Sequence, residues 1–91
     1  MRHNPDLVRE IMLAVEQHPA GKKLYGSQLK TSCHNPYELA DHVQHLIDEG
    51  LIEGEVHLFA GHFPPKFSIS RITTVGHDFL AAMREDQFQN N

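Results

Sequence analysis

The chain has 91 residues, which suffices for one small domain around a single hydrophobic core. Apolar residues make up 40% of the chain and charged residues 22%, a composition that excludes an intrinsically disordered protein. Its net charge of −4 opposes non-specific attraction to nucleic acid or to an anionic membrane.

The first predicted helix covers residues 5–17. Asn4 can cap it, Pro5 suits the first helical turn, and Asp6 favours the positive end of the helix dipole. Apolar residues then recur on one face at helical spacing: Leu7, Val8, Ile11, Met12 and Val15. Pro19 ends the helix because it disfavours helical geometry in the residue before it.

Residues 22–33 carry the weakest pattern of the chain. Leu24-Tyr25 can form a short strand, and Ser27-Gln28-Leu29 can form a turn of helix. A conventional helix-turn-helix needs a full helix in this segment, and the sequence offers little more than that one turn.

The central helix is predicted over residues 36–49. Asn35 and Pro36 repeat the first helix's starting pair, and Glu38 stands where it can reach back to the cap's backbone amide. An apolar stripe follows, formed by Leu39, Val43, Leu46 and Ile47. Gly50 supplies the left-handed residue that stops the helix.

Two strands are predicted after the central helix. Val56 and Leu58 alternate with polar neighbours, as do Phe67 and Ile69, so each run can turn one face to a core. The link over residues 60–65 is loop-like, since its Pro-Pro pair cannot occupy a central strand.

A last helix is predicted to begin after Thr73, which can cap it. Its buried face is expected to hold Val75, Phe79, Leu80 and Met83. Gly76 is expected to permit close backbone packing, and His77 to have a structural role, buried and hydrogen-bonded. Together these elements predict one α+β winged-helix domain, with three main helices and a two-stranded β wing, over residues 1–86, followed by a frayed tail over residues 87–91.

Three stretches of the chain carry recognisable motifs. They are residues 2–9, residues 41–52 from Asp41-His42 to Gly50-Leu51-Ile52, and residues 72–88 with the block Gly76-His77-Asp78-Phe79-Leu80. They resemble a family of small phage- and prophage-associated proteins that is labelled only as a domain of unknown function. In this chain Asp41, Thr74 and Phe88 replace aromatic residues that are usual in that family. The resemblance implies a winged-helix fold and a mobile-element ancestry, and it implies no activity.

Zinc binding is one alternative function. His42 and His45 are three residues apart on the central helix, and Cys33 and His34 come just before it, so the four could supply nitrogen and sulfur ligands. However, each helix histidine lies four residues after an acid, which is enough to explain two solvated histidines without metal. Because no Cys-x-x-Cys or His-Glu-x-x-His pattern occurs, we predict no metal and no cofactor.

Catalysis is not predicted. Cys33 or Ser27 as a nucleophile would need an adjacent base held by a third group, and no such set is visible. Paired carboxylates, a phosphate loop and a dinucleotide pattern are also missing, so no small-molecule substrate is evident. The single cysteine allows no disulfide within the chain and favours a cytoplasmic location. No segment is apolar over the length of a membrane span, so no membrane association is expected.

DNA binding is the usual role of a winged helix, and here the charges oppose it. No Lys or Arg occurs between Lys30 and Lys66, a range that includes the whole central helix. A modest basic edge is the alternative contact surface for DNA, made of Lys22, Lys23, Lys30, Lys66 and Arg71.

A protein partner or self-association is therefore favoured over DNA. The central helix is acidic, and its apolar stripe leaves one face pointing outward. The candidate partner-binding positions on that face are Tyr37, Asp41, Gln44, His45 and Asp48.

Overall fold

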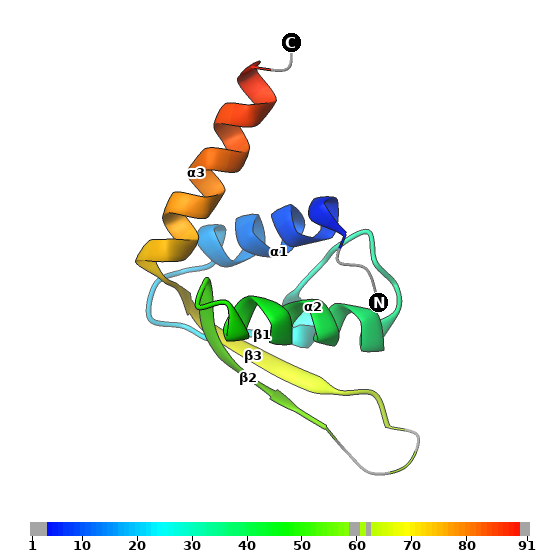
Figure 1. The fold of residues 1–91 in the computed structure, drawn as a ribbon. Helices are drawn as coiled ribbons and strands as arrows, with labels where there is room; N and C mark the ends of the chain where they lie inside the picture. The colour runs from blue at the N-terminus through cyan, green and yellow to red at the C-terminus, as the bar shows by residue number, and fades with distance from the viewer. Residues whose placement is uncertain (1–3, 59–60, 62, 90–91) are drawn as a thin grey trace.

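The chain folds as an α+β domain with three α-helices and one three-stranded antiparallel sheet, as Figure 1 shows. This computed structural model describes residues 4–58, 61 and 63–89, with side chains described as far as residue 84. In chain order the elements are α1 (Pro5–Gln17), β1 (Leu24–Tyr25), the 3-10 turn η1 (Gly26–Gln28), α2 (Pro36–Asp48), β2 (Ile52–His57), β3 (Lys66–Ile72) and α3 (Thr74–Gln89). No helix within the described ranges has the length and apolar character needed to cross a membrane.

Both Asn-Pro helix starts are confirmed. Asn4 Oδ1 accepts the Asp6 amide at 2.9 Å, and Asn35 Oδ1 accepts the amides of Tyr37 at 2.9 Å and Glu38 at 3.2 Å. These bonds satisfy backbone N–H groups that have no partner inside a helix, so both helices begin where the sequence places them. α2 ends one residue before the predicted limit, and Gly50 follows with a φ of 75°.

The weak segment before α2 contains the predicted strand and only one helical turn. β1 covers the expected Leu24 and Tyr25, and η1 covers residues 26–28, shifted by one residue from the predicted turn. Gln28 Oε1 accepts the Tyr25 amide at 2.9 Å and closes the turn. With Leu29 as its only buried residue after β1, the segment lacks the apolar face that would stabilise a longer helix.

The sheet has the strand order β1-β3-β2, so β3 is central. β2 pairs with β3 along its whole length, but Glu53 lies opposite Arg71 while Gly54 lies opposite Ile69. Ser70 is therefore an extra residue on β3, a bulge that returns Arg71 to the same face as Glu53.

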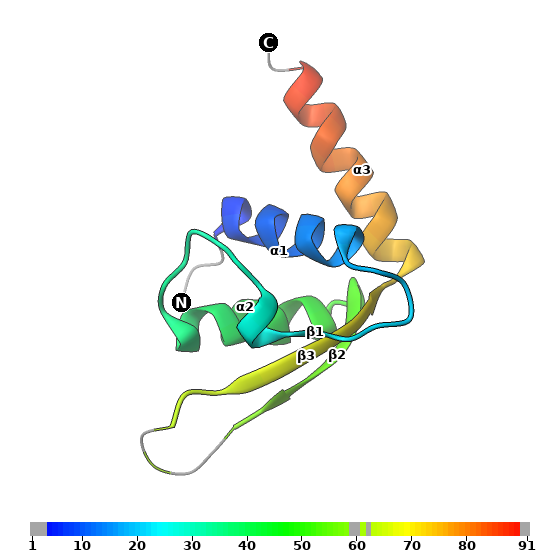
Figure 2. The same cartoon turned by 180° about the vertical axis from the view of Figure 1, so that it is seen from behind.

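The core lies between this sheet and the two helices α1 and α2, which cover the same face of it in both views (Figures 1 and 2). Its fully buried apolar side chains are Leu7, Ile11, Met12, Val43, Leu46, Ile52, Ile69 and Leu80. The predicted inward side chains Phe67 and Ile69 are buried at 7% and 1% exposure. The same prediction is wrong for Leu58, which follows the end of β2 and is 79% exposed, because the hairpin there extends past the helices.

The predicted buried face of α3 is only partly correct. Leu80 is buried and Met83 is half-buried, but Val75 and Phe79 are exposed. α3 contacts the domain through its first turns and then projects away from it (Figure 1), so a single narrow face meets the core. His77 is also exposed, which contradicts the expected buried role.

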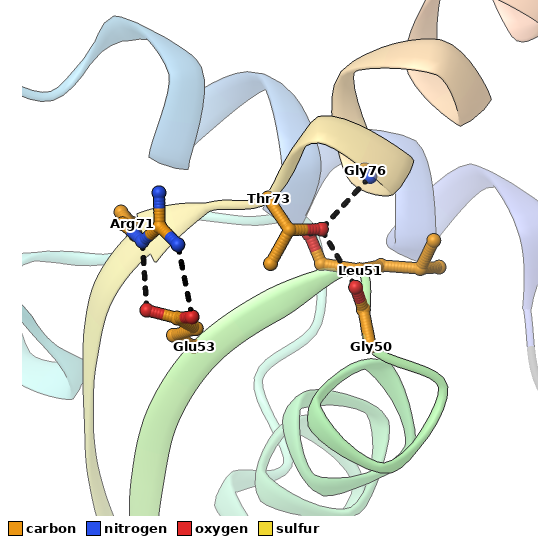
Figure 3. Close-up of polar contacts among 6 residues, drawn as sticks. All are labelled: Gly50, Leu51, Glu53, Arg71, Thr73 and Gly76. Atoms are coloured by element: carbon orange, nitrogen blue, oxygen red, sulfur yellow. Dashed lines mark hydrogen bonds and ion pairs between the residues drawn. The ribbon is translucent and has the colours of Figure 1, made fainter.

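The junction between β3 and α3 lies in close contact with the backbone of Gly50 and Leu51, as Figure 3 shows. Thr73 caps α3 as predicted, since its hydroxyl accepts the Gly76 amide at 3.0 Å. The same hydroxyl lies 2.6 Å from the Gly50 carbonyl oxygen and 3.0 Å from that of Leu51. A Cβ on Gly76 would overlap the Leu51 carbonyl oxygen, so glycine is required for this approach, as the sequence predicts.

The division into a domain over residues 1–86 and a tail over residues 87–91 stays a prediction. α3 includes residues 87–89, and residues 90–91 lie outside the described part of the chain. Residues 60 and 62 of the predicted link also lie outside the described residues, whereas residues 63–65 precede β3 without regular structure.

Candidate functional site

The outer face of α2 carries an exposed polar stripe, which we call the α2 stripe: Tyr37, Asp41, Gln44 and Asp48. The spacings of four, three and four residues align these side chains along one side of the helix, opposite its buried positions. Gln44 Nε2 donates to Asp48 Oδ1 at 2.9 Å, which fixes two neighbouring members of the stripe. All four residues were predicted to point outward, and their role in binding stays a prediction.

His45, the fifth predicted position, lies beside the stripe and is only half-exposed. Its Nε2 is 3.8 Å from Glu49 Oε1, an ion pair when the imidazole is protonated. Since α2 contains no Lys or Arg, the face made by the stripe and its flanks has negative potential.

The five residues of the predicted basic edge are all exposed, but they do not form one surface. Lys66 and Arg71 are at opposite ends of β3, about 16 Å apart at the rise of an extended strand. Lys22 and Arg71 line one cleft, whereas Lys66 lines another.

Arg71 is also engaged with an acid on the neighbouring strand (Figure 3). Its Nε and Nη2 donate to the two carboxylate oxygens of Glu53 at 2.7 and 3.0 Å. These hydrogen bonds, helped by the charge attraction, lower the pKa of the Glu53 carboxyl and raise the pKa of Arg71. A phosphate would have to compete with this bidentate pair for the guanidinium.

His42 is fully buried, which contradicts its predicted place among solvated histidines. Its Nε2 accepts the Asn4 amide at 2.9 Å, so Nδ1 carries the proton and donates to the Glu38 carbonyl oxygen at 2.8 Å. The ring therefore joins the start of α1 to α2. The i, i+4 acid explanation missed this role because the partner on α1 is 38 residues away in sequence.

These contacts disfavour the zinc alternative. A zinc ligand needs a free ring nitrogen, and both nitrogens of His42 are in hydrogen bonds. Cys33 is half-buried, and its thiol donates to the Asn35 carbonyl oxygen at 3.5 Å. Among the residues that the structure describes, no group of three or more histidine, cysteine or acidic side chains could hold a metal ion.

Two clefts flank β1, and neither was predicted from the sequence. One, of about 360 Å³, lies between α1, β3 and α3. The other, of about 380 Å³, is lined by Tyr25, Gly26, Ser27, Pro36, Leu39, Pro64, Pro65, Lys66 and Phe67. Each joins residues from distant segments, so no local motif signals it.

Comparison with known proteins places the chain in a family. No curated protein and no solved structure matches it. A family model with the description Hypothetical protein (DUF2513) matches residues 2–90, nearly the whole chain. The chain therefore belongs to this family of uncharacterised domains.

Proposed function

We propose that this domain is a non-enzymatic module that binds another protein, or a second copy of itself, through the α2 stripe. The observation that carries the proposal is a continuous exposed row of polar and acidic side chains on a helix without a single Lys or Arg. Such a face attracts a basic protein surface and repels a phosphate backbone.

The support for the stripe makes it suitable for recognition. α2 is held at its start by the Asn35 cap, and along its inner side by the buried Leu39, Val43 and Leu46. Side chains on such a rigid helix are presented in fixed positions, which lowers the ordering cost of binding. Tyr37, 52% exposed at the N-terminal end of the stripe, supplies the aromatic residue that commonly anchors an interface.

The proposal includes a winged-helix fold. The order α1-β1-η1-α2-β2-β3 and the strand order β1-β3-β2 support it, with η1 in the place of the middle helix. In that arrangement α2 occupies the position of the recognition helix, and the β2–β3 hairpin is the wing. A phage-associated and cytoplasmic setting belongs to the same proposal, supported by the family motif in residues 72–80 and by the single cysteine.

A paired charge reversal tests the α2 stripe. The double variant Asp41→Lys/Asp48→Lys reverses the charge of the α2 stripe. The control variant Glu55→Lys/Asp78→Lys makes the same change in net charge on exposed residues away from α2. Sedimentation over a range of concentrations and a pull-down of interacting proteins are the measurements. We expect the stripe variant to weaken association about tenfold or more, while the control keeps it. Equal weakening by both variants would show that net charge, and not the stripe, governs association.

DNA binding is the second candidate. The observation that favours it is that Lys22 and Arg71 come together at one cleft. The test is a mobility shift of random duplex at low salt, in which we expect no shift. A shift that is weakened by Lys22→Glu and lost steeply with added salt would replace the protein-binding proposal.

A further inference from the structure

The cleft between α1, β3 and α3 has the construction of a small-molecule site. Its volume is about 360 Å³, and it is bordered by the C-terminal end of α1, the α1–β1 loop, residues 69–72 and His77 in the first turn of α3. Both ribbon views show these segments gathered at one end of the sheet (Figures 1 and 2). Ligand sites in proteins begin at about this volume.

The cleft exists because β1 is so short. β1 pairs only with Ser68 and Ile69, so no described strand continues beside residues 70–72 on that side of β3. The chain before β1 turns away instead, with the Lys22 amide donating to the Pro19 carbonyl oxygen at 3.3 Å. The space between this turn and β3 is the cleft.

The floor of the cleft is apolar and its rim is polar. Val15, Leu24 and Ile69 lie beneath it but are only 7%, 4% and 1% exposed, so the apolar surface open to an occupant comes from Pro19, Ala20 and the half-buried Ile72. The charged or titratable groups at the rim are Glu16, His18, Lys22, Arg71 and His77. An occupant therefore needs an apolar body and a charged group at one end.

The charges at the rim select an anion. Glu16 accepts a hydrogen bond from Arg84, so its charge is already balanced. Arg71 is balanced by Glu53, as described above. Lys22 forms no ion pair with any described residue, and it leaves one positive charge at the rim. The nearby start of α3 adds the positive end of a helix dipole.

We propose that this cleft binds a small carboxylate with an aromatic or branched aliphatic body. The body lies on Pro19, Ala20 and Ile72, and the carboxylate is held by Lys22 with Arg71 beside it. This site is separate from the α2 stripe. The proposal therefore goes beyond the proposed function, and its test does not depend on the outcome for the α2 stripe.

The test is an amide-resolved NMR titration with four small probes. Phenylacetate has the apolar body and the anion, phenylacetamide lacks the charge, acetate lacks the body, and phenethylamine inverts the charge. We expect phenylacetate to bind with a Kd on the order of 1 mM, the range of a fragment-sized ligand. Its shifts should centre on Lys22, Ser70 and His77, and the other three probes should bind about tenfold more weakly.

Two charge-reversal variants complete the test. Lys22→Glu should weaken phenylacetate binding about tenfold or more, whereas Lys30→Glu, which changes another exposed lysine that does not line the cleft, should leave it unchanged. Equal binding of acetate would overturn the role of the apolar floor. Tighter binding of phenethylamine would mean that Glu16 recognises the ligand, and an unchanged affinity in Lys22→Glu would mean that Lys22 does not hold the carboxylate. Either result overturns the proposal. An absence of shifts with phenylacetate also overturns it.

Discussion

The two ends of the β2–β3 hairpin differ in almost every physical respect. At the base, Leu51 and Ile52 are 8% and 1% exposed, and the Thr73 hydroxyl contacts two carbonyl oxygens of the opposite segment. At the outer end, Leu58 and Phe63 are 79% and 72% exposed. Large apolar residues occur at both ends, so composition alone does not decide which end supports the fold. Position relative to α1 and α2 decides it.

Truncating one apolar side chain at each end should give the largest contrast. Ile52→Ala removes a fully buried side chain and should lower the free energy of unfolding by about 3 kcal/mol, through lost burial and the cavity left behind. Leu58→Ala removes an exposed side chain and should change the free energy of unfolding by no more than about 0.5 kcal/mol. Urea denaturation measures both. Similar losses would mean that the outer end packs against something in solution.

Removing the Thr73 hydroxyl should have an intermediate effect. Thr73→Ala leaves the Gly76 amide without its cap and removes the donor to the carbonyl oxygens of Gly50 and Leu51. We expect a loss of about 1–2 kcal/mol by the same denaturation assay. Thr73→Ser keeps the hydroxyl and should recover more than half of that loss. If Thr73→Ser lowers the free energy of unfolding as much as Thr73→Ala does, the threonine methyl group stabilises the base of the hairpin and the hydroxyl does not.

The smallest effect should come from the exposed pair between Glu53 and Arg71. Because Arg71 lowers the pKa of Glu53 in the folded state, the pair stabilises the fold above the ordinary glutamate pKa of about 4.3 and loses this effect as the pH falls through the folded value. The difference in urea midpoint between the wild type and Glu53→Gln should therefore shrink in acid. High salt should also reduce it. A difference that is constant between about pH 7 and about pH 3 would contradict this account.

The local parts of the fold could be predicted from the sequence. The Asn-Pro starts of α1 and α2, the Gly50 stop and the Thr73 cap depend on residues within one turn of each other. The α2 stripe could be predicted for the same reason, because it is the complement of an apolar stripe on the same helix.

The wrong predictions of burial depend on contacts between distant segments. The burial of His42 depends on the Asn4 amide, which no helical spacing indicates. Val75 and Phe79 have the spacing of a buried face, yet α3 leaves the domain before a second element can cover them. The residues of the predicted basic edge do not form one surface, because Lys66 and Arg71 lie near opposite ends of β3. Spacing within one element does not indicate which other element covers a side chain, whereas the separation of Lys66 from Arg71 follows from their spacing within β3.

The backbone amide and carbonyl of Leu51 link elements that are far apart in sequence. Its carbonyl oxygen accepts the Thr73 amide at 3.0 Å and lies against Gly76, while its amide donates to the Leu46 carbonyl oxygen at 3.0 Å. The end of α2 and the start of α3 are thus connected through the backbone of one residue, whose amide and carbonyl groups belong to two successive peptide planes. A displacement at the start of α3 would therefore reach the end of α2 through two main-chain hydrogen bonds. The start of α3 is therefore fixed by main-chain contacts, and the hydrogen bond from Arg84 to Glu16 adds a side-chain link to α1 further along the helix.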